Sequence, residues 1–173
     1  MRVDDAQHQA RYQDLLGRHM AALRRLAWSY ARDEFEDLFQ EIATALWTAL
    51  PGFRGDSSER TWVYRVAHNT AISFAVQRKR RAGREATGES APEPASDANP
   101  ERDAIGQQQR ARLWAAVQTL PIRDRQIVVL YLEGLTAGDI EVVTGLGAGA
   151  VATRLTRIRQ RLAATIRGDE GQP

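Results

Sequence analysis

Cysteine is absent from this 173-residue sequence, which excludes disulfides, thiolate metal sites and thiol catalysis. The histidines His8, His19 and His68 lie far apart and lack the spacing of metal ligands. No apolar run approaches the roughly 20 residues that a membrane helix needs, and the N-terminal segment lacks a signal peptide's apolar core. The sequence therefore predicts a soluble cytoplasmic protein with no membrane insertion, no metal and no other cofactor.

Large apolar side chains are also absent from residues 77–104, where no Leu, Ile, Val, Met or aromatic residue occurs. Much of this stretch is Pro, Ala, Ser and Glu, so it cannot bury enough apolar surface to become ordered. A structureless loop of this length is uncommon within one domain. We therefore predict two domains, at 8–81 and 105–167, joined by a flexible linker at 82–104. A long surface loop within one domain is the alternative.

Segments with the alternating pattern of a strand are lacking, and both flanking regions show helical periodicity instead. In the first region, apolar residues recur at three- and four-residue intervals over Tyr12–Tyr30 and Phe35–Ala49. A third helix is expected from about Glu59, with Ser57 or Ser58 as its N-terminal cap. The pattern predicts an all-α fold whose first domain is a small helical bundle.

The second region also consists of expected helices, separated by turn-forming residues. A helix over 105–120 should stop at Pro121, and the next helix should end at Gly134. A short helix near 136–144, a turn at Gly145–Gly147 and a longer basic helix then follow. This order is typical of a helix-turn-helix, whose second helix enters the major groove of DNA.

Charge is nearly balanced over the chain, with 24 Lys+Arg against 22 Asp+Glu and a net charge of +2, so the total does not indicate nucleic acid. Its distribution is uneven. A basic cluster lies at 78–84, an acidic cluster lies at 33–41, and the charged residues at 154–167 are all basic. Separated charge of this kind attracts phosphate at one place and a basic partner at another.

The final helix has two faces of different chemistry, since successive residues are turned by about 100°. Its apolar stripe consists of Val151, Leu155, Ile158 and Leu162. The other side and its edges carry hydroxyl, amide and guanidinium groups, on Thr153, Arg154, Thr156, Arg157, Arg159, Gln160 and Arg161. Arginine can pair with guanine through two hydrogen bonds, and further arginines can hold phosphates. The helix is therefore a candidate DNA reader, with an ordinary solvated surface helix as the alternative.

A polar stripe lies on the expected helix at 35–49. The core-facing residues leave Asp37, Gln40, Glu41 and Thr44 on the opposite side. Two carboxylates one turn apart could serve a metal or acid–base chemistry, but no histidine or third carboxylate converges on them, which argues against catalysis. Two interpretations stay open, a solvated face and a docking surface for a basic partner.

Several segments together resemble a known family. The first region contains EDLFQEI (36–42), FRGDSS (53–58), TWVYRVAHNTA (61–71) and RKRR (78–81). In this order and spacing they resemble the second region of extracytoplasmic-function (ECF) sigma factors. LPIRDRQIVVLYLEGLTAGDI (120–140) and GAVATRLTRIRQRL (149–162) resemble the fourth region of the same family. The resemblance covers nearly the whole chain outside the linker and the extreme termini.

The resemblance implies an RNA polymerase sigma factor, which directs promoter-specific transcription initiation and is not an enzyme, so no catalytic residue is expected. The implied partners are core RNA polymerase, promoter DNA as duplex and as melted single strand, and an anti-sigma factor. In the family, acidic and amide residues of the EDLxQE motif dock on a coiled coil of the polymerase clamp. Here these residues are Asp37, Gln40 and Glu41.

For the minus-ten element, the resemblance implies capture of an unstacked base by the loop over 53–60 and the helix that follows. The matching residues here are Arg54, Ser57, Arg60, Arg65 and Asn69. Asn69 has a structural alternative, tying its helix to the loop. Trp62 and Tyr64 are aromatic candidates for stacking on melted DNA, although the family has a buried tryptophan at the position of Trp62.

For the minus-thirty-five element, the resemblance implies that the last helix reads duplex DNA. The matching residues are Thr153, Arg154, Thr156, Arg157 and Arg161. The chain departs from the family at Ala152, where a basic residue facing DNA is usual, and at Glu141, where a small residue is usual. These departures concern the promoter sequence more than the class of protein.

Two other functions compete with this one. A stand-alone helix-turn-helix regulator would use the first domain for dimerisation or sensing and would bind duplex DNA tightly without polymerase. A helical interaction protein would show little salt-dependent DNA binding. The EDLFQEI and FRGDSS segments favour the sigma factor, because neither competitor needs them.

Overall fold

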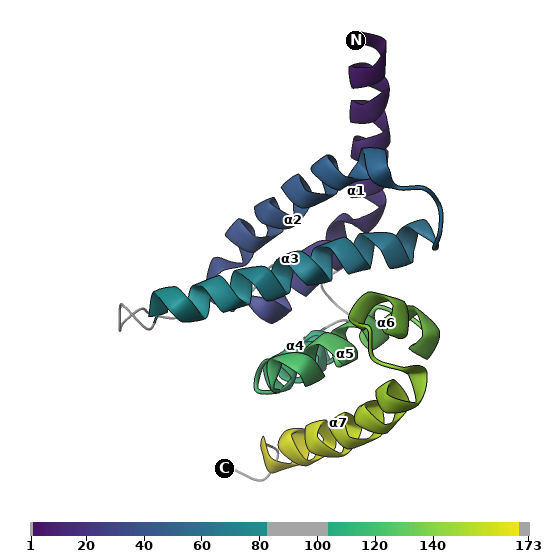
Figure 1. Ribbon diagram of the computed structural model, residues 1–173. Coiled ribbons are helices and arrows are strands. Elements are labelled where there is room, and N and C mark those ends of the chain that lie inside the picture. Colours follow the sequence, from purple (N-terminus) through teal and green to yellow (C-terminus); the bar gives the residue numbers. More distant parts are fainter. Residues whose placement is uncertain (1, 83–103, 170–173) are drawn as a thin grey trace. The chain divides into compact units, whose positions relative to one another are not determined.

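The computed structural model describes residues 2–82 and 104–169 (Figure 1). Helices make up most of both ranges and no strand occurs in either, so the predicted all-α fold class is confirmed. The chain divides into two compact units, residues 1–91 and 92–173. Apart from its two end residues, the linker predicted at 82–104 lies outside the described residues.

The first unit is a bundle of α1 (Arg2–Tyr30), α2 (Phe35–Ala49) and α3 (Glu59–Ala82), in which each helix contacts the other two. Short 3-10 helices lie before and after α2, η1 (Arg32–Glu34) and η2 (Leu50–Gly52). The core residues at the centre of the bundle are Leu15, Leu23, Leu26, Leu38, Ile42, Leu46, Val63 and Ala67.

The first helix is longer than its apolar periodicity predicted. It begins at Arg2 rather than near Tyr12. Periodicity marks only the part of a helix that packs against a core, whereas the polar residues before Tyr12 continue the helix beyond that part.

The start of α3 is fixed by local hydrogen bonding. The Ser58 hydroxyl accepts a hydrogen bond from the backbone N–H of Thr61 at 3.0 Å, which satisfies one of the free amides of the first turn. Of the two serines predicted as caps, Ser58 is therefore the one that caps the helix. The segment 53–58 that leads into α3 turns at Gly55, whose φ of 81° favours glycine.

The second unit contains α4 (Ala104–Gln118), α5 (Ile122–Leu132), α6 (Ala137–Thr144) and α7 (Ala148–Asp169). Helix α7 contacts each of the other three. The core of the second unit contains residues from all four helices, and these include Val117, Ile127, Val129, Leu130, Ile140, Val151 and Ile158. The helix-turn-helix predicted from the sequence is therefore present, with α6 as its first helix and α7 as its second.

The geometry of the helix-turn-helix is set by two end signals on α6. Thr136 and Asp139 form a capping box, in which each side chain accepts the other residue's backbone N–H. At the other end, Gly145 adopts a left-handed conformation with φ of 73° and ends the helix.

Among the helices described, none has the length and apolar character that crossing a bilayer requires.

Candidate functional site

Three exposed polar residues on α2 form one candidate surface. Asp37, Gln40 and Glu41 are exposed, whereas Leu38 and Ile42 on the other side of the helix are fully buried. The outward orientation expected from the sequence is therefore present in the structure. Asp37, Gln40 and Glu41 are called the α2 docking face below.

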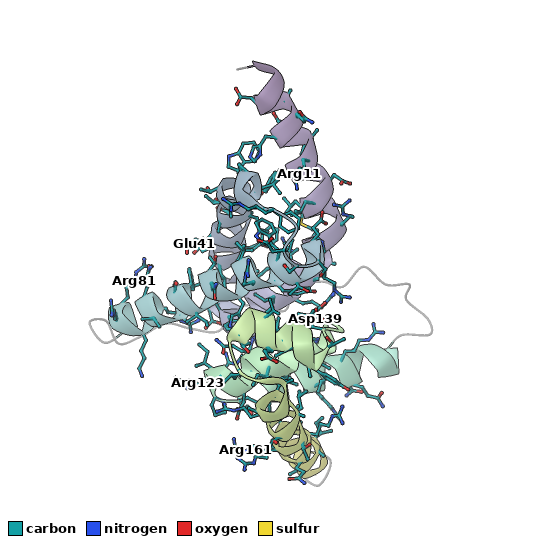
Figure 2. All side chains as sticks on the ribbon, turned by 45° about the vertical axis from the view of Figure 1, so that its right-hand side comes forward. Arg11, Glu41, Arg81, Arg123, Asp139 and Arg161 are labelled. Atoms are coloured by element: carbon teal, nitrogen blue, oxygen red, sulfur yellow. The ribbon has the colours of Figure 1, made fainter. Side chains whose placement is uncertain are left out.

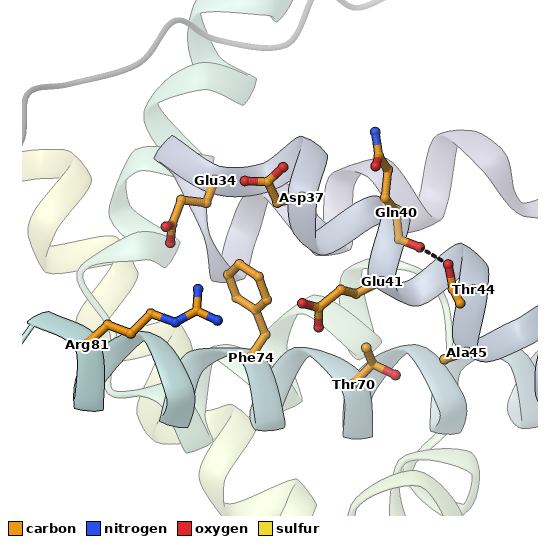
Figure 3. A pocket seen from close by; sticks show the side chains of 9 residues that line it. All are labelled: Glu34, Asp37, Gln40, Glu41, Thr44, Ala45, Thr70, Phe74 and Arg81. Atoms are coloured by element: carbon orange, nitrogen blue, oxygen red, sulfur yellow. Dashed lines mark hydrogen bonds between the residues drawn. The ribbon is translucent and has the colours of Figure 1, made fainter.

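The α2 docking face forms one wall of an open groove between α2 and α3 (Figure 3). The opposite wall consists of Thr70, Phe74 and Arg81, all from α3. Figure 3 shows Phe74 pointing from α3 into the groove, with Glu41 projecting from α2 beside it. Phe74 is only 4% exposed, so it is the carboxylates of the groove that suit a basic partner.

No sequence pattern predicted that residues of α3 form the opposite wall of this groove. Thr70 and Phe74 are one turn apart and share a face of their helix, but a sequence does not show which helix that face meets. Glu34, from the 3-10 helix before α2, adds a third acidic residue to the groove lining. Within the residues that the structure describes, no group of three or more His, Asp or Glu side chains is placed to hold a metal ion.

The residues expected at the minus-ten element fall into two groups. Arg54 and Ser57 lie in the segment before α3, where Arg54 is exposed and Ser57 is half-buried. Arg60, in the first turn of α3, holds its guanidinium 5.9 Å from the centre of the Tyr64 ring. These residues surround the entry to α3.

Arg65 and Asn69 form the second group, one turn apart on the exposed side of α3. Arg60 lies five residues before Arg65, which turns it toward a different side of the helix. The five residues therefore line the start and one face of α3 rather than a single pocket.

Neither aromatic residue near this site is free to stack on DNA. Trp62 is only 6% exposed and Tyr64 only 1% exposed. The Phe53 ring lies against Trp62 at 5.0 Å between centroids and covers it. The expectation of a buried Trp62 is confirmed, and stacking by Tyr64 would require the core to open.

Helix α7 separates its two faces as the sequence predicted. Val151, Leu155, Ile158 and Leu162 are buried. The residues exposed to solvent include Thr153, Thr156, Arg157, Gln160 and Arg161. Figure 2 shows the Arg161 side chain projecting away from the ribbon of α7. A helix placed in this way presents hydroxyl and guanidinium donors on the side that faces away from its own core.

One carboxylate on α5 faces two arginines of α7, which no sequence pattern indicated. Asp124 lies 3.3 Å from the guanidinium of Arg154 and 3.6 Å from that of Arg161. These three residues, with Arg157 and Gln160, line an open groove beside α7. Asp124 thus offsets part of the positive charge of a surface that is otherwise suited to phosphate.

The other edge and the N-terminus of α7 are held by different contacts. The Arg159 guanidinium donates to the Tyr131 hydroxyl and lies over the Tyr131 ring, 5.0 Å from its centre. The Glu141 carboxylate accepts the backbone N–H of Ala148 at 3.0 Å, where a negative charge favours a helix N-terminus. Ala152 is exposed and adds no basic group to this turn. The charged side chains of α7 therefore begin at Arg154.

Comparison with protein families matches both units to one family. The family description "Sigma-70 region 2" covers residues 15–81, and "Sigma-70, region 4" covers residues 110–162. These matches contain the α2 docking face and the exposed face of α7.

Curated relatives agree with these matches. The chain is 34% identical over 137 residues to the RNA polymerase sigma-H factor of Pseudomonas aeruginosa, covering 75% of this chain and 71% of that protein. It is 31% identical over 134 residues to the ECF RNA polymerase sigma-E factor of Escherichia coli strain K12, covering 73% of this chain and 70% of the relative.

Solved structures show a similar fold. CnrH in complex with the cytosolic domain of CnrY superposes with a TM-score of 0.66 at 26% identity, over 95% of both chains. The sigma factor RpoE of Bartonella quintana, in complex with the anti-sigma factor NepR, gives a TM-score of 0.73 at 23% identity, over 90% of this chain and 96% of that one.

Proposed function

Since the chain belongs to the ECF group of RNA polymerase sigma factors, we propose that it engages core RNA polymerase through the α2 docking face and contacts promoter DNA through α3 and α7. The first domain, at 8–81, would bind core polymerase and the minus-ten element. The second domain, at 105–167, would bind the minus-thirty-five element. The linker at 82–104 would join them.

The observation that carries the docking proposal is the arrangement of Asp37, Gln40 and Glu41. All three side chains are exposed on a helix whose other face is buried, and all three line one groove. Exposed acidic residues on a rigid helix attract a basic partner from solution. A basic coiled coil of the polymerase fits this charge.

The minus-ten proposal rests on the exposed residues around the start of α3. Arg54 and Arg60 flank the loop that would receive an unstacked base, while Arg65 and Asn69 lie along the helix that follows. Extruding a base costs a few kcal/mol, which hydrogen bonds and charge contacts in such a site can offset. Because Trp62 and Tyr64 are buried, we assign them to the core rather than to base stacking.

The minus-thirty-five proposal rests on the exposed face of α7. Thr153, Thr156 and Arg157 lie on the side of α7 that faces away from the core, where they can reach base edges in a major groove. Arg154 and Arg161 lie at one edge, where they can hold phosphates and fix the register of the helix. The small side chain of Ala152 leaves the first turns of α7 close to the DNA without a charged contact.

Two further expectations complete the proposal. We expect an anti-sigma factor as a partner. In both similar solved structures the chain that resembles this one is bound to a second protein, and in one of them that second protein is the anti-sigma factor NepR. The protein supplies binding energy and promoter choice, while nucleotide addition belongs to the polymerase, so no catalytic residue is assigned. It would act in the cytoplasm, with the polymerase.

Co-elution with bacterial core RNA polymerase on a sizing column tests the docking face. The parent chain should co-elute stoichiometrically at moderate salt, and the double variant Asp37→Lys, Glu41→Lys should elute alone because two attractive charges become repulsive. The matched control reverses Asp5 and Asp14, two exposed acidic residues of α1, and should co-elute like the parent. Equal co-elution of both double variants would remove the docking assignment, and a folded parent chain that never co-elutes would favour the stand-alone regulator.

A further inference from the structure

An aromatic cluster lies where the N-terminal part of α1 meets the end of α2. The His8 ring is 4.1 Å from the Trp47 ring, centre to centre, and the Tyr12 ring is 5.0 Å from it. The Tyr12 hydroxyl donates to the backbone carbonyl of Ala43 at 3.1 Å, which fixes α1 against α2 at this point. Even with two rings against it, Trp47 remains 40% exposed.

This cluster lies close to the loop that the proposed function assigns to the minus-ten element. Arg11, on the same part of α1 (Figure 2), holds its guanidinium 5.8 Å from the centre of the Phe53 ring. Phe53 opens the loop and packs on Trp62. The N-terminal turns of α1 therefore border the loop directly, and Arg11 is exposed there.

The chemistry of the cluster favours a nucleic acid over a core role. Proteins that bind single strands combine aromatic rings, on which bases stack, with basic side chains that follow the backbone phosphates. Trp47 is exposed, and Arg11 is exposed on the part of α1 that packs against it, so both parts are present. Each arginine contact to a phosphate adds salt-dependent affinity. The region 2 match begins at residue 15, so His8, Arg11 and Tyr12 precede the segment that this family model matches.

We propose that Trp47, His8 and Arg11 form a second contact site for single-stranded DNA, beside the loop over 53–60. An unstacked base stacks on the exposed part of Trp47, and Arg11 contacts a neighbouring phosphate. The site lengthens the path of a melted strand across the first unit. It rests on the proposed capture of melted DNA by this unit, and so it has to be tested separately from the loop.

The test is the binding of the full chain to a fluorescein-labelled oligothymidylate of about 20 nucleotides, followed by anisotropy at several salt concentrations. Trp47→Leu keeps an apolar side chain but removes the stacking face, and should weaken binding roughly fivefold or more. Trp47→Phe keeps a ring and should retain most of the affinity. Arg11→Ala should lower the slope of log affinity against log salt by about 0.7, the value for one phosphate contact on a single strand.

The controls separate this site from the loop and from a structural role. Met20→Ala removes an exposed apolar side chain outside the cluster, on α1 and 37% exposed, and should leave binding unchanged. Arg54→Ala with Arg60→Ala tests the loop. Weaker binding in the loop variant alone would overturn the second site and keep the loop. Loss of core co-elution in Trp47→Leu, with oligonucleotide binding intact, would identify the surface as a protein interface instead. A parent chain that leaves the oligonucleotide free at low salt would overturn both single-strand proposals.

Discussion

His68 lies in the core of the first unit, only 2% exposed, with its Nδ1 3.3 Å from the hydroxyl oxygen of Tyr30. Burial lowers the pKa of His68 from 6.5 to about 4, because the charged imidazolium would lose its hydration. The side chain therefore packs as a neutral ring between α1 and α3. Its position explains why a scattered histidine in the sequence has neither a metal nor a catalytic role assigned to it.

The lowered pKa predicts a pH dependence of stability. Between pH 6.5 and about 4 the unfolded chain binds a proton at His68 that the folded chain does not, so the free energy of unfolding falls as the pH falls through this window. At pH 5 the loss should be about 2 kcal/mol relative to pH 7. Urea unfolding of the parent chain and of His68→Gln at both pH values measures it, since the variant should lack this contribution. The same pH dependence in both chains would contradict the assignment.

At the scale of the element, the turn between α6 and α7 depends on backbone conformation more than on contacts. Gly145 has a φ of 73°, and a Cβ added there would meet nothing within 4 Å. Gly149, in the first turn of α7, also has open space around it but no such φ. Neither position is crowded, so the two glycines differ in backbone conformation alone.

Substitution of the two glycines by alanine should have opposite effects. Gly145→Ala should destabilise the second unit by about 1 kcal/mol, because an L-residue is strained in the left-handed region. Gly149→Ala should stabilise it by up to about 1 kcal/mol, through the better helix propensity of alanine. Thermal unfolding followed by circular dichroism measures both. A neutral Gly145→Ala would show that the turn accepts another conformation.

Asp124 sets the charge of the basic edge of α7. Its ion pairs with Arg154 and Arg161 are long, and these arginine side chains are 35% and 63% exposed, so the pairs contribute little stability and open readily. Asp124→Asn should therefore raise the affinity for non-promoter duplex DNA at low salt by roughly fivefold, with a salt dependence steeper by about one phosphate contact. Asp124→Glu keeps the charge and should bind like the parent. Weaker binding in Asp124→Asn would mean that the carboxylate positions the arginines instead.

At the scale of the whole molecule, the two units have separate cores and separate candidate surfaces. The α2 docking face belongs to the first unit, and the exposed face of α7 belongs to the second. Each unit thus contains the residues that its proposed role requires. The two proposed roles are therefore divided between the two units.

Fragments of residues 1–82 and 104–173 should therefore keep separate activities. The first fragment should co-elute with core polymerase and lose this when Asp37 and Glu41 are reversed in charge. The second should bind duplex DNA with a steep salt dependence and show no co-elution. Sizing chromatography and anisotropy measure the two properties. A first fragment that fails to fold alone, judged by its circular dichroism, would show that the two units stabilise each other.

The sequence alone determined the features that depend on residues close to one another along the chain. Helical periodicity, the glycine turn and the basic final helix predicted an all-α fold with a helix-turn-helix, because helix faces repeat every few residues. For the same reason the outward orientation of Asp37, Gln40 and Glu41 could be read from spacing. Motifs in register then indicated the family before any tertiary contact was considered.

Only the tertiary structure decided which residues from distant segments meet. It placed Phe74 of α3 opposite the α2 docking face, Asp124 of α5 against two arginines of α7, and His8 of α1 beside Trp47 of α2. It also buried Tyr64, which spacing had left as a stacking candidate. These outcomes depend on how the helices pack, and periodicity within one helix contains no information about the helix across from it.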